Sequence, residues 1–317
     1  MKGVFDAVVA VPALAHRPSI AQISPIMTMI DQNTAPPGQP SRPGAPPAPS
    51  GIPAPDIAPR PMGAVNWLGF WTLTAKEVRR FLKVYFQTII APVVTTLMFL
   101  AIFVLAMGRA AFDVAGVPFS RFLAPGLIMM AMTQNAFANT SSSLIIAKVQ
   151  GNIVDVLMPP LSPLEQTLAF ALGGVIRGLI VGVAVAIAMA CFVPMSMHAP
   201  AFALYHAVMA SLMLSLLGMI GGIWADKFDH MAAVTNFIVT PLSFLSGTFY
   251  SIDRLPESFH LIALANPFFY MIDGFRYGFI GHADGSLTVG ALVVAGINVA
   301  LGAVAYGMFR TGYKLKA

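Results

Sequence analysis

The feature that most constrains this chain is a set of six apolar stretches, each long enough to cross a bilayer and almost free of charge. They are Phe86–Met107, Phe122–Ala147, Leu168–Phe192, Phe202–Ile223, Met231–Phe249 and Leu287–Phe309. A helix rises about 1.5 Å per residue, so about 20 apolar residues cover the ~30 Å of bilayer hydrocarbon. Only the third stretch holds an acidic or basic residue, Arg177. With 57% hydrophobic and 10% charged residues, the chain is predicted to be an all-α integral membrane protein with six transmembrane helices.

The first 66 residues have a different character. Eleven of the 26 residues from Pro36 to Pro61 are proline. Proline-rich segments of this kind favour extended, unpacked chain. We therefore predict two parts: a disordered N-terminal extension at residues 1–66 and a transmembrane domain at residues 67–317.

The stretch Trp67–Tyr85 has the periodicity of an amphipathic helix. On a helical projection, one face collects Trp67, Trp71, Val78, Phe81, Leu82 and Tyr85, and the other collects Lys76, Arg79, Arg80 and Lys83. An aromatic face beside a basic face is typical of a helix that lies in the membrane interface, in contact with lipid. The alternative is a soluble helix packed on a partner domain.

Basic residues are distributed unevenly around the six stretches. If the N-terminus is cytoplasmic, nine basic residues flank the inner ends and four lie in the outer loops. The inner set is Lys76, Arg79, Arg80, Lys83, Lys148, Lys227, Arg310, Lys314 and Lys316, and the outer set is Arg109, Arg121, Arg254 and Arg276. This asymmetry predicts that both termini are cytoplasmic.

The fifth stretch predicts a re-entrant element after it. Pro241 lies in its middle, where proline kinks or breaks a helix. A short polar connector follows, and Asn266-Pro267 then reads as a helix start, with Asn at the N-cap and Pro at the first helical position. Asp273 and Arg276 are three residues apart on that helix and are expected to pair on one face. We predict that these four residues form a structural corner on the outer side of the membrane.

The loop between the second and third stretches contains several residues that typically end or start helices. Gly151 precedes a short apolar-acidic turn, and Pro159-Pro160 ends it. Ser162-Pro163-Leu164-Glu165 then has the pattern of a capping box, which would open the third helix. The sequence predicts a short, rigidly held helix on the cytoplasmic side; an ordinary connector is the alternative.

The second stretch holds the most polar cluster in the predicted membrane region. Asn135, Asn139 and Ser142 fall within about 60° of one another on a helix. Amides in hydrocarbon must find partners, because each unsatisfied group costs several kcal/mol. Two interpretations stay open: this face lines a substrate path, or its side chains bond to neighbouring helices and to the preceding turn.

Motifs for catalysis and nucleotide binding are missing from the sequence. There is no G-x-x-x-x-G-K-[ST] phosphate loop, no G-x-S-x-G elbow and no closely spaced histidine set. We therefore expect no enzymatic activity, no metal site and no bound cofactor in this chain, and no nucleic-acid partner. Any ATP and Mg²⁺ would be bound by a partner subunit.

Two segments carry a family resemblance: LSGTFYSIDRLP and NPFFYMIDGFRYGFIG. Together they resemble the C-terminal signature of ABC-2 type ABC transporter permeases, the membrane subunits of drug and polysaccharide exporters. The matching residues are Leu245, Ser246, Gly247, Leu255, Pro256, Asn266, Pro267, Asp273, Arg276 and Gly281. The likeness extends from about Trp67 to the C-terminus.

This resemblance implies a function, a partner and a location. The loop after the second span would be a coupling helix that docks on a separate ATPase subunit through Gln150, Asp155, Leu157, Pro159 and Pro160. Two permease copies would assemble with two ATPase subunits in a bacterial inner membrane. The assembly would export an amphipathic small molecule or a lipid-linked glycan. The alternative is an ion-coupled secondary transporter, which is disfavoured because no predicted span contains Asp or Glu.

Overall fold

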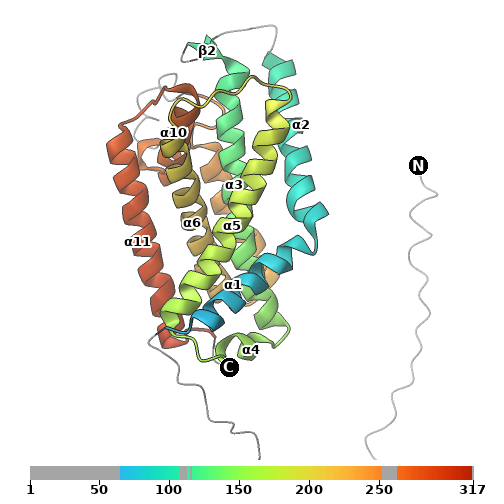
Figure 1. The fold of residues 1–317 in the computed structure, drawn as a ribbon, viewed down its shortest axis with the longest axis vertical. Coiled ribbons are helices and arrows are strands. Elements are labelled where there is room, and N and C mark those ends of the chain that lie inside the picture. Colours follow the sequence, from blue (N-terminus) through green and yellow to red (C-terminus); the bar gives the residue numbers. More distant parts are fainter. Residues whose placement is uncertain (1–64, 108–112, 115, 252–262, 316–317) are drawn as a thin grey trace, which may run out of the picture. The chain divides into compact units, whose positions relative to one another are not determined.

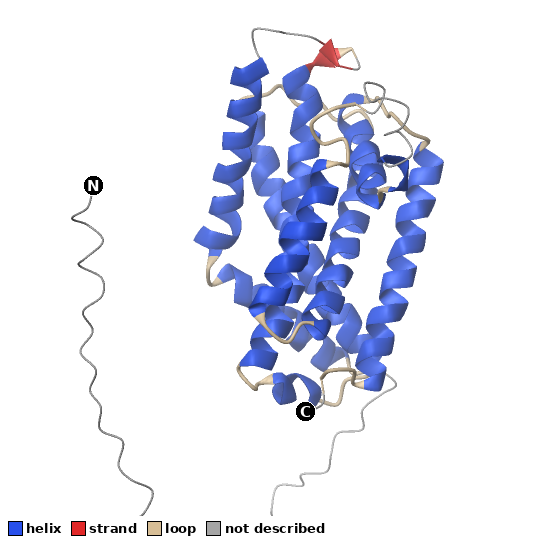
Figure 2. Ribbon diagram, turned by 180° about the vertical axis from the view of Figure 1, so that it is seen from behind, coloured by secondary structure: helices blue, strands red, loops and turns tan. Residues whose placement is uncertain are grey.

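The computed structural model describes residues 65–107, 113–114, 116–251 and 263–315, most of them helical. The elements, in chain order, are α1 (Trp67–Leu82), η2 (Phe86–Ile90), α2 (Ala91–Met107), β1 (Asp113–Val114), β2 (Val117–Pro118), α3 (Phe119–Val149), α4 (Ile153–Leu157), α5 (Pro163–Ala190), α6 (Pro200–Trp224), α7 (Phe228–Val234), η3 (Thr235–Val239), α8 (Thr240–Phe244), α10 (Pro267–Ile280) and α11 (Leu287–Thr311). The long helices run side by side, and α1 crosses them obliquely (Figure 1). Figure 2 shows that the short β-hairpin, β1–β2, lies at the end of the bundle opposite α4.

Two larger parts of the sequence predictions fall outside the described residues, as do the single flanking residues Arg109 and Lys316. One is the extension at residues 1–66, apart from Val65 and Asn66. The other is most of the polar connector after the fifth stretch, which includes Leu255 and Pro256.

The all-α prediction is confirmed for the described residues, and four helices among them are long and apolar enough to cross a membrane. These are Phe86–Ala106, Pro163–Ala190, Pro200–Trp224 and Leu287–Thr311. Helix α3, with 31 residues, is also long enough, but its polar cluster makes it less apolar. The helical segment from α7 to α8 ends at Phe244, short of the predicted Phe249. The second and fifth spans therefore remain predictions.

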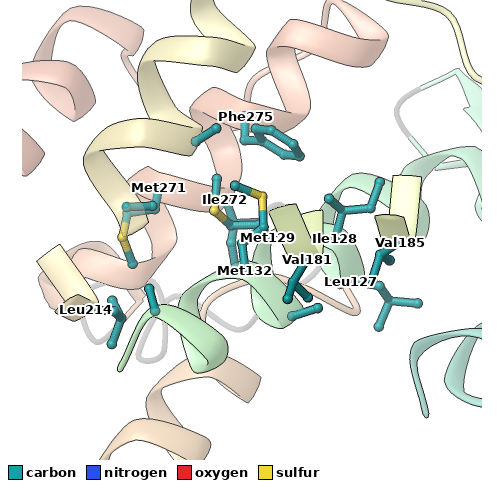
Figure 3. Close-up of a cluster of buried hydrophobic side chains, with 14 of the residues drawn as sticks. Leu127, Ile128, Met129, Met132, Val181, Val185, Leu214, Met271, Ile272 and Phe275 are labelled. Atoms are coloured by element: carbon teal, nitrogen blue, oxygen red, sulfur yellow. The ribbon is translucent and has the colours of Figure 1, made fainter. Parts of the chain in front are cut away.

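The core lies where α3, α5, α6 and α10 meet. Figure 3 shows Met129, Met132 and Ile128 of α3 among side chains from the other three helices. The neighbours labelled there are Val181 and Val185 of α5, Leu214 of α6, and Met271, Ile272 and Phe275 of α10. Since α3 packs against both α5 and α6, the polar residues of α3 are held in fixed positions.

Small residues let these helices approach closely. Gly174 and Gly178 of α5 face Ser215 and Ser211 of α6, and Gly218 of α6 faces the backbone of α3. A Cβ atom at Gly218 would overlap with the carbonyl oxygen of Phe137. The glycines therefore serve helix packing within one subunit.

We expect Gly218→Ala to destabilise the protein by about 1–3 kcal/mol, because α3 and α6 would have to separate to admit the methyl group. Gly296→Ala is the matched control, since a Cβ atom added there, in α11, would have no neighbour within 4 Å. That change should be neutral or stabilising, as alanine favours helix over glycine. Thermal unfolding in detergent measures both; equal midpoints for the two variants would contradict the close packing.

Pro241 does not break its helix. A π-helical turn, η3, directly precedes α8, in which Pro241 is among the first residues. In this turn the N–H of Thr240 donates to the carbonyl of Thr235, one residue beyond the usual α-helical partner. Proline offers no N–H and crowds the preceding turn, and the wider π turn accommodates it. The predicted break is thus wrong, because the helix continues through a π bulge.

Candidate functional site

The loop between α3 and α5 is built as the sequence predicts. Helix α3 ends before Gly151, whose φ of 75° is left-handed. The capping box is confirmed: the N–H of Ser162 donates to Glu165 Oε2 at 2.6 Å, and the N–H of Glu165 donates to Ser162 Oγ at 3.3 Å. The short helix α4 lies between Gly151 and this capping box. Its start and its end are therefore both fixed.

Asn66 fastens this loop to the start of α1. Its Oδ1 accepts the N–H of Gly69 at 2.9 Å and so caps α1, while its Nδ2 donates to the carbonyl of Pro160 at 3.2 Å. The backbone N–H of Asn66 also donates to Glu165 Oε1 at 2.6 Å. The carboxylate of Glu165 thus joins the first turns of α1 and α5. The loop and the start of α1 are thus held together.

One side of α4 is buried and the other is free. Val156 is only 4% exposed and packs in the apolar cluster formed with α1, α3 and α5, whereas Val154 is 54% and Met158 75% exposed. Of the predicted coupling residues, Gln150, Asp155, Pro159 and Pro160 are exposed, and Leu157 is half-buried against the cluster. The arrangement presents a rigid, exposed edge at one end of the bundle.

A second set of contacts joins helix ends at this same end. Lys148, at the end of α3, donates to the carbonyls of Ile223 and Ala225 at 2.8 and 2.6 Å, and its ammonium lies 3.5 Å from Asp226. Lys314, beyond α11, lies 2.8 Å from the other carboxylate oxygen of Asp226. The hydrogen bond from Lys314 lowers the pKa of Asp226 below its usual value. The ends of α3, α6 and α11 are therefore held together where α4 projects.

A cavity of about 380 Å³ lies between α3 and the α7–η3–α8 segment. Its walls mix polar and apolar side chains without any charge: Gln134, Asn135, Phe137, Ala138, Ser141, Ser142, Ile145, Phe228, Met231, Thr235, Val239 and Thr240. Gln134 and Asn135 also line a second cavity, of about 280 Å³, on the side of α3 that faces α2. The polar face of α3 thus borders open space on two sides.

The three residues predicted for the substrate path do not all face this space. Asn135 and Ser142 line the larger cavity, but Asn139 is fully buried and does not. Asn139 instead offers its backbone oxygen and its Oδ1 to Arg80 at 2.6 and 3.1 Å. Asn135 is itself anchored, since its Oδ1 accepts from Arg177 at 3.0 Å. All three residues bond to neighbouring helices, as the second interpretation expects, and the substrate path stays a prediction for Asn135 and Ser142.

Glu77 is a residue of this region that the sequence did not single out, and it lies on the face of α1 that packs against the bundle. Its side chain is 0% exposed; it accepts from Ser143 Oγ at 2.7 Å and pairs with Arg80 at 3.2 Å. Arg80 also reaches Ser142 at 3.2 Å. The one sequence signal was the i, i+3 spacing of Glu77 and Arg80 in an otherwise basic helix.

These contacts correct the predicted faces of α1. Phe81 is 1% exposed and buried in protein, so it does not belong to a lipid-facing aromatic face. Arg80 is turned inward toward Glu77 and α3, so it leaves the exposed basic row. Helix α1 therefore has three faces: one buried against α5, one apolar and exposed, and one basic and exposed.

The start of α10 agrees with the sequence. Asn266 caps the helix by accepting the N–H of Phe268 at 3.0 Å, and Pro267 takes the first position. The amide of Asn266 also donates to the carbonyl of Leu242 at 2.9 Å, which ties α10 to α8. With 14 residues, α10 is too short to cross ~30 Å of hydrocarbon.

The predicted pairing of Asp273 with Arg276 is wrong. The carboxylate of Asp273 accepts the backbone N–H groups of Asp284 and Gly285 at 2.8 and 3.0 Å. The guanidinium of Arg276 donates to the carbonyl of Gly247 at 2.5 Å and lies over the ring of Phe122, 3.8 Å from its centroid. Each side chain therefore binds a different loop, because the helix orients them toward different neighbours.

Known proteins are similar in sequence to this chain over most of its length. The family model described as ABC-2 type transporter matches residues 69–280. The Escherichia coli K12 protein named inner membrane transport permease YadH is 37% identical over 253 residues, which cover 79% of this chain and 98% of that protein. Nodulation protein J of Rhizobium leguminosarum bv. viciae is 24% identical over 237 residues, covering 74% of this chain and 90% of that protein.

Proposed function

Because this chain belongs to the ABC-2 type transporter family and is a membrane permease of an ABC transporter, we propose that it exports its substrate by the following route. A separate ABC ATPase subunit, implied by the family, binds the exposed edge of α4 and hydrolyses ATP. Two permease copies form the assembly, with both termini of each in the cytoplasm. The chain has six spans, and α10 belongs to a re-entrant element.

The observation that carries this proposal is the unbroken set of contacts from α4 to the polar face of α3. Asn66 joins the α4 loop to α1. Glu77 and Arg80 of α1 then hold Ser143, Ser142 and the backbone of Asn139. Ser142 lines the larger cavity. Movement imposed on α4 by an ATPase would therefore reach the cavity wall through the loop at Pro160 and the hydrogen bonds of α1.

The cavity also supports the proposed cargo class. Amide and hydroxyl groups from Gln134, Ser141 and Thr235 stand beside apolar walls such as Phe137 and Met231. Uncharged walls of this mixture suit a molecule with hydroxyl or amide groups and an apolar portion. We propose an amphipathic small molecule, with a lipid-linked glycan as the second candidate.

We expect Asp155→Lys to uncouple transport from ATP hydrolysis. Asp155 is exposed on α4, and reversing its charge would disturb docking while removing only about 0.5 kcal/mol of helix-dipole stabilisation. In proteoliposomes that contain the permease and its ATPase, the amount of substrate moved per ATP hydrolysed should fall several-fold, with membrane insertion unchanged.

Asp229→Lys is the matched control, because Asp229 is also exposed in the first turn of a short helix, α7. It should leave the transport-to-hydrolysis ratio unchanged. If the two variants had the same ratio, α4 would not be the coupling element.

A further inference from the structure

We propose that the outer side of α1 is a binding surface for anionic phospholipid. On this surface a cationic row contacts headgroup phosphates and an apolar row enters the hydrocarbon edge. Such binding depends on membrane insertion and not on the proposed export function.

The orientation of α1 is fixed by its buried side. Leu73, Thr74, Glu77 and Phe81 are buried against the bundle. The hydrogen bonds of Glu77 with Ser143 and of Arg80 with Asn139 hold that side against α3. The helix crosses the long helices obliquely near the end where α4 lies (Figure 1). It therefore cannot rotate to hide a different face, and it lies across the direction of the spans.

What remains exposed is divided into two adjacent rows. The apolar row contains Trp67, Leu68 and Trp71, which are 64%, 76% and 56% exposed, and continues to Leu82. The cationic row contains Lys76, Arg79 and Lys83, all exposed. At 3.6 residues per turn the two rows lie side by side along the helix. The apolar side continues past α1 through the exposed rings of Tyr85 and Phe86.

The cationic row has no acidic partner within the described part of the protein. Among the described residues, Lys76, Arg79 and Lys83 form none of the ion pairs. The one acid of the helix, Glu77, is turned inward and already engaged by Arg80 and Ser143. Three unneutralised cations beside exposed tryptophans complement a leaflet surface of anionic headgroups over acyl chains. Tryptophan is also enriched at the headgroup level of a bilayer.

We expect α1 to bind anionic phosphatidylglycerol in preference to zwitterionic phosphatidylcholine, and tryptophan fluorescence can test this. The chain has three tryptophans, so in a Trp224→Phe background only Trp67 and Trp71 report. The full-length protein would be reconstituted with increasing fractions of brominated phosphatidylglycerol or of brominated phosphatidylcholine. Each basic side chain near an anionic surface is worth about fivefold in affinity. Half-maximal quenching should therefore need a lipid fraction of brominated phosphatidylglycerol about fivefold or more below the fraction of brominated phosphatidylcholine that has the same effect.

Matched double variants locate the effect. Arg79→Gln with Lys83→Gln should abolish most of this preference. Arg310→Gln with Lys227→Gln removes one arginine and one lysine that are exposed elsewhere, and should leave the preference intact. Equal quenching by the two lipids in the parent protein would overturn the proposal. Absence of quenching by either lipid would also overturn it, and would indicate that a protein such as the ATPase subunit covers this face.

Discussion

Replacing Arg276 by alanine is expected to cost about 3 kcal/mol or more of stability, more than any other substitution proposed for this chain. The guanidinium is 1% exposed, holds the carbonyl of Gly247 and stacks over Phe122. It thus joins α10, α3 and the turn that follows α8. Truncation leaves a cavity and a buried carbonyl without its donor, and both losses destabilise the fold. The unfolding midpoint in detergent and the rate of proteolysis measure the effect.

Two further variants define what Arg276 contributes. Arg276→Lys keeps the charge but loses the planar stacking on Phe122, so an intermediate loss is expected. Exchanging Asp273 and Arg276 should rescue nothing, because each binds its own loop. Arg310→Ala, at an exposed position, should change stability by no more than about 0.5 kcal/mol. If the charge-exchanged double variant recovered stability, Asp273 and Arg276 would have to pair directly, which would contradict the structure.

Replacing Glu77 by alanine is expected to impair both stability and coupling. The carboxylate is fully buried and bonds to Ser143 and Arg80. Its loss leaves Arg80 without a counter-charge and should cost about 2 kcal/mol, a figure typical of a hydrogen bond to a charged group. Since Arg80 also holds the backbone of Asn139, the contact between α1 and the cavity wall should loosen. Substrate moved per ATP hydrolysed should then decrease.

Glu77→Gln separates the two effects. It keeps the size of the side chain and an acceptor for Ser143, so most of the stability should remain, but the ion pair with Arg80 is lost. A lowered transport-to-hydrolysis ratio in a stable Glu77→Gln protein would support a coupling role. Thr72→Ala, on the same helix and exposed, should alter neither quantity. An unchanged ratio in both Glu77 variants would show that α1 serves packing alone.

Features that depend on local sequence were predictable. The capping box of Ser162 and Glu165 and the start of α10 at Asn266 and Pro267 are confirmed, because the interacting groups lie within a few residues of one another. The helical class followed from the apolar stretches, since spanning backbone must bond to itself. The position of α4 followed from Gly151 and the two prolines that bound it.

Features that depend on distant partners were not predictable. Asn66 bonds to Glu165, 99 positions away, and Arg80 bonds to Asn139, 59 positions away. The three-residue spacing of Asp273 and Arg276 allows an ion pair but does not require one. In the structure both side chains instead form hydrogen bonds with backbone groups of other loops. In the same way, Asn139 shares a helix face with Asn135 and Ser142, but the approach of α1 covers it. Tertiary contacts decided each of these outcomes.

Whether α4 contacts the ATPase subunit can be tested directly by cross-linking. In a Cys191→Ser background, required because Cys191 is exposed, a cysteine would be placed at Val154 or at Val156 for cross-linking in native membranes. Val154 is exposed and Val156 is buried within the same short helix. Val154→Cys should capture the ATPase subunit, and Val156→Cys should capture little or none. Cross-links from Val154→Cys to periplasmic proteins would place α4 on the opposite side of the membrane and contradict the proposed coupling.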